Sequence, residues 1–103
     1  MAYNLIITDE AEDRLIKATN YILFELKNYQ AAMHLYDEVE NIYDRLETNP
    51  WQFPLCQSET LSERKFRQAV LPNMNYRLIF KIIEQQVYVI GIFHDSENFS
   101  DKL

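Results

Sequence analysis

The chain has 103 residues, of which 48% are apolar, and this is enough to form the core of one domain. Sixteen acidic residues against ten basic ones give a net charge of −6, which argues against a protein whose whole surface grips nucleic acid. One cysteine and two histidines exclude an internal disulfide and offer no ligand spacing for zinc, so neither a metal nor another cofactor is expected.

We expect residues 1–103 to fold as a single domain, because one glycine and three prolines are too few for a disordered linker. The sequence contains no run of about eighteen apolar residues and no charged leader followed by an apolar stretch. A cytoplasmic location, without a membrane partner, is therefore expected.

Two helical patterns follow a short β-prone run at residues 3–7. Apolar residues recur at steps of three and four in residues 9–27 and again in residues 30–48, so each segment is expected to form an amphipathic helix. Asn28 marks the break between them, and Asn49-Pro50 ends the second, because proline disfavours helical geometry in the preceding residue. Two long helices joined by so short a turn predict an antiparallel hairpin.

The second half of the chain is typical of a β-meander. Residues 51–63 follow neither period and are expected to form an irregular loop. Residues 65–71, 76–83 and 87–93 are rich in β-branched and aromatic side chains and are separated by short turns. The N-terminal strand would pair at the edge of this meander, and residues 94–103 are expected to form a polar tail.

The expected fold is α+β: a two-helix antiparallel hairpin packed on one face of a four-stranded, mainly antiparallel sheet, in the order strand, helix, helix, strand, strand, strand. In residues 76–83 one alternating set is wholly apolar and should face the helices, whereas the other carries the basic groups. The core is expected to contain Leu15, Ile22, Leu35, Val39, Ile42, Leu78, Phe80 and Ile82.

Positive charge is concentrated in one part of the chain. Residues 61–81 hold five basic residues and one acidic residue, so the rest of the chain carries the acidic excess. Such a distribution can present a basic face to phosphates while the helices stay acidic. The candidate RNA or phosphate contacts in this segment are Arg64, Lys65 and Lys81, beside Arg67 and Arg77.

This element order, with particular residues, resembles the RelE/ParE toxin superfamily over essentially the whole chain. The matching residues are Asn49-Pro50 at the end of the second helix, Arg67 leading into the meander, Asn75-Tyr76-Arg77-Leu78-Ile79-Phe80 on its middle strand, and Phe93-His94 before a tail that ends in Leu103.

The resemblance implies a bacterial type II toxin whose partner is a cognate antitoxin. RelE-like members cut messenger RNA on the ribosome without a metal, whereas ParE-like members poison DNA gyrase and are not nucleases. The hypothesis placed first is a ribosome-dependent RNA endonuclease, with the ribosome and messenger RNA as partners. The alternatives are a gyrase inhibitor, or a decayed, non-catalytic module that keeps only its antitoxin interface.

The nuclease hypothesis assigns roles to four residues. Attack by a 2′-hydroxyl on its phosphate needs a base, an acid and cations for the charge that develops. By resemblance Arg77 and Arg67 would supply the cations, His94 would move a proton, and Glu59 lies near a catalytic glutamate of some relatives. All three of Arg67, Arg77 and His94 are expected to surround one phosphate, with both arginines on the same face of the sheet.

Three of these residues, Arg77, Arg67 and His94, also have a simpler interpretation. Arg77 could be a solvated strand residue, Arg67 could serve antitoxin docking, and a histidine stands at the position of His94 in many ParE-like members. The chain also departs from the superfamily, because Glu97 stands where many members have an arginine and because the isoelectric point, near 4.8, is acidic. Tyr36 and Tyr43 follow the helical period and are expected to pack within the fold.

Overall fold

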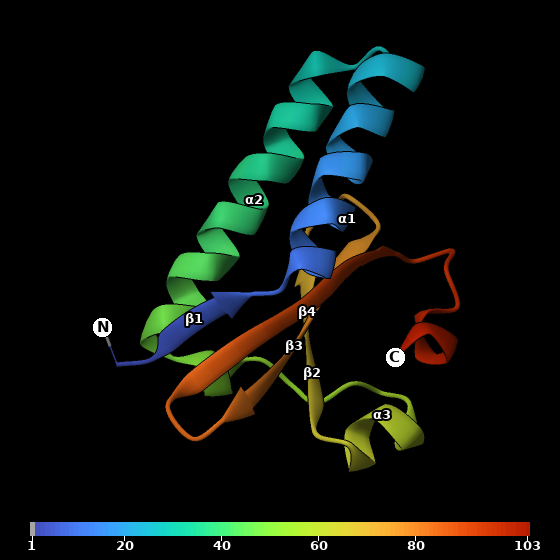
Figure 1. Cartoon of the computed structure of the whole chain (residues 1–103). Helices are drawn as coiled ribbons and strands as arrows, with labels where there is room; N and C mark the ends of the chain where they lie inside the picture. The colour runs from blue at the N-terminus through green and yellow to red at the C-terminus, as the bar shows by residue number, and fades with distance from the viewer. Residues whose placement is uncertain (1) are drawn as a thin grey trace.

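The computed structural model describes residues 2–103, which form two long helices on a four-stranded sheet (Figure 1). The strand order is β1-β4-β3-β2, with β1 parallel to β4 and the other neighbours antiparallel. The predicted fold class is therefore confirmed. The elements are β1 (Asn4–Ile7), α1 (Asp9–Asn20), α2 (Tyr29–Thr48), α3 (Glu59–Glu63), β2 (Phe66–Leu71), β3 (Tyr76–Ile83) and β4 (Gln86–His94).

The side chain of Thr8 joins the start of α1 to the sheet. Its oxygen accepts a hydrogen bond from the backbone N–H of Ala11 and caps the first turn of the helix. The same hydroxyl donates to the carbonyl of Val89 on β4, at 2.8 Å. One residue therefore fixes both where α1 begins and which strand it packs against.

The first helix is shorter than the pattern of residues 9–27 predicts. Regular α-helical geometry ends at Asn20, and a π-helical turn spans Tyr21–Glu25 before Lys27 adopts a left-handed conformation with φ of 51°. The tip of the helical hairpin projects beyond the sheet (Figure 1). Leu26, which directly follows the π-helical turn, is consequently 56% exposed.

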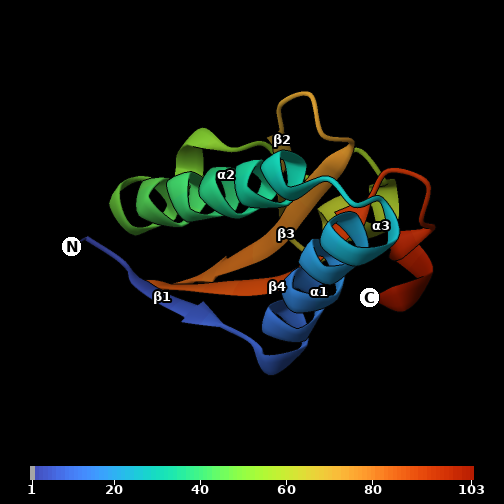
Figure 2. The same ribbon diagram turned by 90° about the horizontal axis from the view of Figure 1, so that it is seen from above.

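The main core lies between the two long helices and the sheet face that they cover (Figure 2). Six of the eight predicted core residues are buried, and the other two, Leu15 and Ile82, are partly buried against them. The alternation predicted for β3 holds, since Leu78 and Phe80 are fully buried on this helix-covered face. In the described part of the chain no helix is both long and apolar enough to cross a membrane.

A second, smaller core covers the opposite face of the sheet, which we call the outer face. Residues 51–63 contain the short helix α3, and the polar tail predicted for residues 94–103 ends in a 3₁₀ turn at Phe99–Lys102. Figures 1 and 2 both place this turn beside α3. Both segments cover side chains that would otherwise be exposed, and the buried members of this core are Cys56, Leu61, Phe66, Ile79 and Phe93.

Truncation of Leu78 tests the orientation of the central strand. Its side chain is fully buried, so we expect Leu78→Ala to lower the free energy of unfolding by about 2–5 kcal/mol. Val70→Ala on β2 is the control, since Val70 is 55% exposed and should lose no more than about 0.5 kcal/mol. Urea titrations of the two variants measure both values, and equal losses would contradict the strand orientation.

Candidate functional site

Arg67 and Arg77 lie on opposite faces of the sheet. On the antiparallel pair β2 and β3, Arg67 is opposite Phe80 and Val70 is opposite Arg77. Residues directly opposite each other share a face, and three positions along a strand reverse it. Arg67 therefore shares the helix-covered face with Phe80, whereas Arg77 points to the outer face. The expectation that both arginines face the same way is wrong.

Arg77 is held by neighbours on the outer face. Its Nε donates to Asp95 at 3.1 Å, and its NH1 donates to the side-chain oxygen of the buried Gln68 at 2.9 Å. The guanidinium also lies 5.5 Å from the centre of the Phe99 ring. Two of these three groups belong to the C-terminal segment, so that segment engages the guanidinium of Arg77, whose side chain is 22% exposed.

Arg67 lies on β2, which is an edge strand of the sheet. Its guanidinium donates to the carbonyl of Phe53 at 2.6 Å and lies over the ring of Trp51, 4.7 Å from its centre. The segment before α3 runs along this edge, where Leu55 forms a β-bridge to Arg67. Arg67 thereby holds the loop that follows α2 against the sheet.

His94, on the helix-covered face, is far from Arg67. Its ring packs edge-on against Tyr76, and its Nδ1 is 2.8 Å from the hydroxyl oxygen of Ser96. Along the register His94 and Arg67 are two strands and four residues apart, roughly 16 Å between Cα atoms. The three residues expected around one phosphate are not brought together.

The remaining candidate site residues are Glu59 and three cations near the start of β2. Glu59 is an exposed residue in the first turn of α3. Arg64 and Lys81 both lie over the Phe66 ring on the outer face, each 4.9 Å from its centre. Lys65 and Arg67 line a hollow of about 360 Å³ at the edge of β2, on the face opposite to Arg64 and Lys81.

We call the four cations at the start of β2 the basic patch: Arg64, Lys65, Arg67 and Lys81. Within residues 2–103 none of them forms an ion pair with a carboxylate. Arg64 and Lys65 are exposed, and the patch wraps around the edge of β2. Its positive charge is therefore available to an anionic partner.

Glu97 ties the tail to the rest of the fold, a role that the sequence did not suggest. Its carboxylate accepts hydrogen bonds from Arg14 on α1 at 3.3 Å, from Lys102 at 2.9 Å, and from the backbone N–H of His94 at 2.8 Å. Burial of this carboxyl raises its pKa, but these hydrogen bonds outweigh burial, and the pKa of Glu97 lies below its usual value.

Gly91 makes room for the ring of Phe93 and for the arginine that Glu97 binds. A Cβ atom at Gly91 would lie 3.3 Å from the Cδ of Arg14 and 2.8 Å from the ring of Phe93. The guanidinium of Arg14 rests over that ring, 4.2 Å from its centre. Glu97 thus places a negative charge where many superfamily members have an arginine, and Arg14 on α1 supplies the cation that pairs with it.

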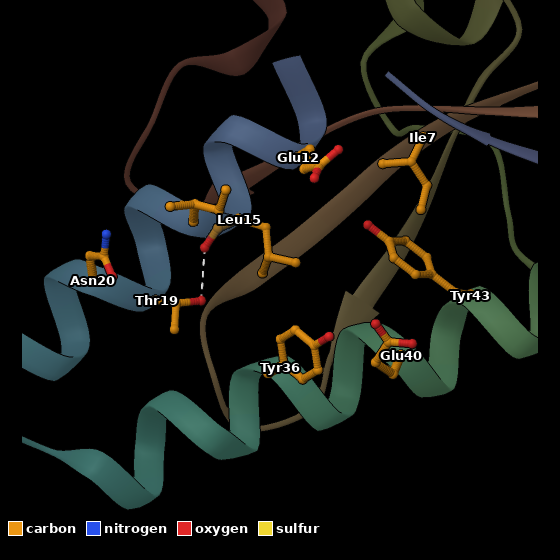
Figure 3. A pocket seen from close by; sticks show the side chains of 9 residues that line it. Ile7, Glu12, Leu15, Thr19, Asn20, Tyr36, Glu40 and Tyr43 are labelled. Atoms are coloured by element: carbon orange, nitrogen blue, oxygen red, sulfur yellow. Dashed lines mark hydrogen bonds between the residues drawn. The ribbon is translucent and has the colours of Figure 1, made fainter. Parts of the chain in front are cut away.

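A groove of about 380 Å³ lies between α1 and α2 (Figure 3). Its walls are mainly apolar, and Leu15, Tyr36 and Tyr43 project into the space between the helices. Two carboxylates, Glu12 on α1 and Glu40 on α2, stand at its rim. A second, more polar hollow of about 400 Å³ lies beside α1 and contains His94.

The described residues bring together no group of three His, Cys, Asp or Glu side chains that could hold a metal ion. Burial raises the pKa of the Cys56 thiol, although the charge of Arg77 opposes the effect. A protonated, buried thiol is a poor nucleophile.

A family model describing the ParE toxin of the type II toxin-antitoxin system parDE matches residues 5–99. The chain belongs to this family. The match extends over the sheet and both long helices, so the RelE/ParE resemblance is confirmed. A comparison with curated proteins gave no match to this toxin.

Solved structures of toxins share its fold. A chain of the chromosomal ParDE system from P. aeruginosa superposes with a TM-score of 0.73 at 15% identity, over 90% of this chain and 96% of that one. A chain of the toxin-antitoxin complex RelBE2 from Mycobacterium tuberculosis gives 0.61 at 19% identity, over 94% and 95%. The YoeB dimer from Staphylococcus aureus gives 0.57 at 10% identity, over 91% and 99%.

Replacing the Glu97 carboxylate should change how stability depends on pH. A lowered pKa means that the ionised group stabilises the fold fully above the ordinary glutamate pKa, about 4.3, and loses this contribution as the pH falls through the folded value. We expect Glu97→Gln to cost about 1–2 kcal/mol at pH 7 and much less at pH 3.

Urea titrations at the two pH values measure the difference. Glu25→Gln is the control, because Glu25 is exposed and forms no ion pair within the described residues. The same loss for Glu97→Gln at pH 3 and pH 7 would show that the charge of Glu97 does not stabilise the fold.

Proposed function

We propose that this toxin acts by binding its target rather than by cutting RNA, and that the target is DNA gyrase, as in the ParE-like branch of the superfamily. The observation that carries the proposal is the separation of Arg67, Arg77 and His94, which occupy two faces and two ends of the sheet. The match to the ParE family model points the same way. From the sequence alone the RNA endonuclease was placed ahead of the gyrase inhibitor, and this proposal reverses that order.

The physical reason lies in what RNA cleavage requires. A single phosphate is a few ångströms across, so its base, acid and stabilising cations must converge on one point. Arg77 is occupied by Asp95 and Gln68, and Arg67 by the Phe53 carbonyl. Both arginines act as structural residues here, and this supports a mechanism that does not depend on them for catalysis.

Under this proposal the basic patch contacts the target. Its four cations have no carboxylate partners in residues 2–103, and Phe66 and Trp51 lie beneath them. A gyrase–DNA complex offers both phosphates and acidic side chains to such a surface. Arg64 and Lys65, the two exposed members of the patch, should also increase the rate of association with an anionic surface.

Neutralisation by an antitoxin is the second part of the proposal. Two of the similar structures come from systems that contain an antitoxin, ParDE and RelBE2. In this chain β1 is an edge strand with one neighbour, β4, so its other side can accept an added strand. The groove between α1 and α2 can accept a helix or an extended segment.

An RNA endonuclease centred on His94 is the second candidate function. One observation favours it: His94 stands at the wall of the polar hollow together with Tyr76, Arg14 and Lys17. A histidine, a tyrosine and two cations are groups that can move protons and stabilise a phosphate. The acidic residues in the same hollow, among them Glu10 and Asp13, weaken its attraction for RNA.

Purified toxin tested against both targets should decide between these functions. We expect it to inhibit supercoiling by gyrase and to leave messenger RNA intact on translating ribosomes. Arg64→Gln with Lys81→Gln should weaken gyrase inhibition about tenfold, because each lost ionic contact contributes up to about 1 kcal/mol. Lys17→Gln with Lys27→Asn removes the same charge from the helical hairpin and should have little effect.

Other outcomes assign the remaining hypotheses. Cleaved messenger RNA with normal supercoiling would establish the endonuclease, and a loss of roughly a hundredfold in His94→Ala would then identify the residue that moves a proton. Normal growth on expression of the wild type would instead support a decayed module that retains only its antitoxin interface.

Co-expression with the product of an adjacent short reading frame tests the antitoxin. We expect a complex that survives gel filtration at micromolar concentration and suppresses growth arrest, since an added strand and a seated helix bury an interface of ordinary size. Two proteins that elute separately would contradict this part of the proposal.

A further inference from the structure

The groove between α1 and α2 contains a buried polar group without a partner. Tyr43 on α2 is only 6% exposed, and among the described residues its hydroxyl has no hydrogen-bond partner. Figure 3 shows this hydroxyl pointing into the space between the helices. Buried hydroxyl groups are normally hydrogen-bonded, so an orphan aimed into a groove indicates a group that completes it from outside.

The charges around the groove indicate which kind of group that is. Burial, followed by the negative charges of Glu40 and Glu12, raises the pKa of Tyr43 to about 12. Neither glutamate forms an ion pair in residues 2–103. The groove therefore has a negative potential at its rim and a tyrosine that remains protonated.

The walls restrict the occupant further. Leu15, Ile16 and Tyr36 also line the groove, and the side chains of Ile16 and Tyr36 are about half exposed. A hydrated metal ion would gain nothing from these apolar walls. A lysine or arginine side chain matches both features, because its aliphatic stem can lie on apolar surface while its charged end reaches carboxylates and a hydroxyl oxygen.

We propose that this groove binds a lysine or arginine side chain presented by an apolar segment of the antitoxin, with the cation between Glu12 and Glu40 and a hydrogen bond to the oxygen of Tyr43. The inference rests on the proposed antitoxin partner and adds the chemistry of its recognition. The toxin's net charge of −6 agrees with a partner segment that is basic at this point.

A peptide probe tests the groove directly. The probes are acetyl-Leu-Lys-Leu-amide and acetyl-Leu-Nle-Leu-amide, in which norleucine keeps the aliphatic stem and removes the charge. NMR titration of labelled toxin should show shifts at Leu15, Tyr36 and Tyr43 with the lysine peptide. Affinity should fall about tenfold with the norleucine peptide, and by a similar factor in Glu12→Gln with Glu40→Gln.

Matched variants extend the test to the antitoxin itself. Asp37→Asn with Asp44→Asn changes the net charge equally from exposed positions on α2 that do not line the groove. We expect the Glu12 and Glu40 double variant to weaken the complex at least tenfold and the control to leave it unchanged. Tyr43→Phe keeps the packed ring and should weaken the complex severalfold without lowering the melting temperature of the free toxin.

The outcomes separate this inference from the proposal on which it rests. Equal affinity of the wild type, the groove variants and the control for the antitoxin would overturn the inference and leave the antitoxin partner established. Absence of any complex would overturn the proposed partner, and the peptide titration would still decide the chemistry of the groove. Equal binding of the lysine and norleucine peptides would show that the groove recognises only apolar groups.

Discussion

The structure depends on a central strand that is apolar on both faces. Leu78 and Phe80 on one side of β3 and Ile79 on the other are all fully buried, so neither face can be left in water. The helical hairpin covers one face. The outer face requires a second cover, which the chain supplies from two short segments, α3 and the C-terminal 3₁₀ turn. Residues that the sequence presents as a loop and a tail are therefore parts of a core.

This second cover determines what the basic residues can do. To close over Ile79 and Phe93, the tail must cross the outer face, and in doing so it brings Asp95 and Phe99 onto Arg77. Glu97 and Arg14 hold the tail in that position across the edge of β4. A cation that would be solvated on an open sheet becomes a structural contact. Within residues 2–103, a cluster of cations without carboxylate partners remains at the start of β2.

The two long helices have a different division of roles. Their lower turns pack on the sheet, whereas their upper turns project past it and keep apolar side chains such as Phe24 and Tyr29 exposed (Figure 1). Between them the helices leave a groove with carboxylates at its rim. A toxin with a basic patch at one edge and an acidic groove between its helices can contact partners of opposite charge on separate surfaces.

Local patterns in the sequence were sufficient for the two long helices, apart from the end of α1, for the strands and for one face of the sheet. Helical periodicity, the Asn49-Pro50 stop and the alternation in β3 predicted the fold class and most of the main core, because these signals depend on neighbouring residues. These local patterns could not predict the register between the strands. One position of register decides whether a side chain faces the helices or the outer face, and so Arg67 and Arg77 were wrongly placed together. The contacts of Glu97 and Gly91, and the groove around Tyr43, likewise depend on residues distant in the chain, which only the tertiary structure brings together.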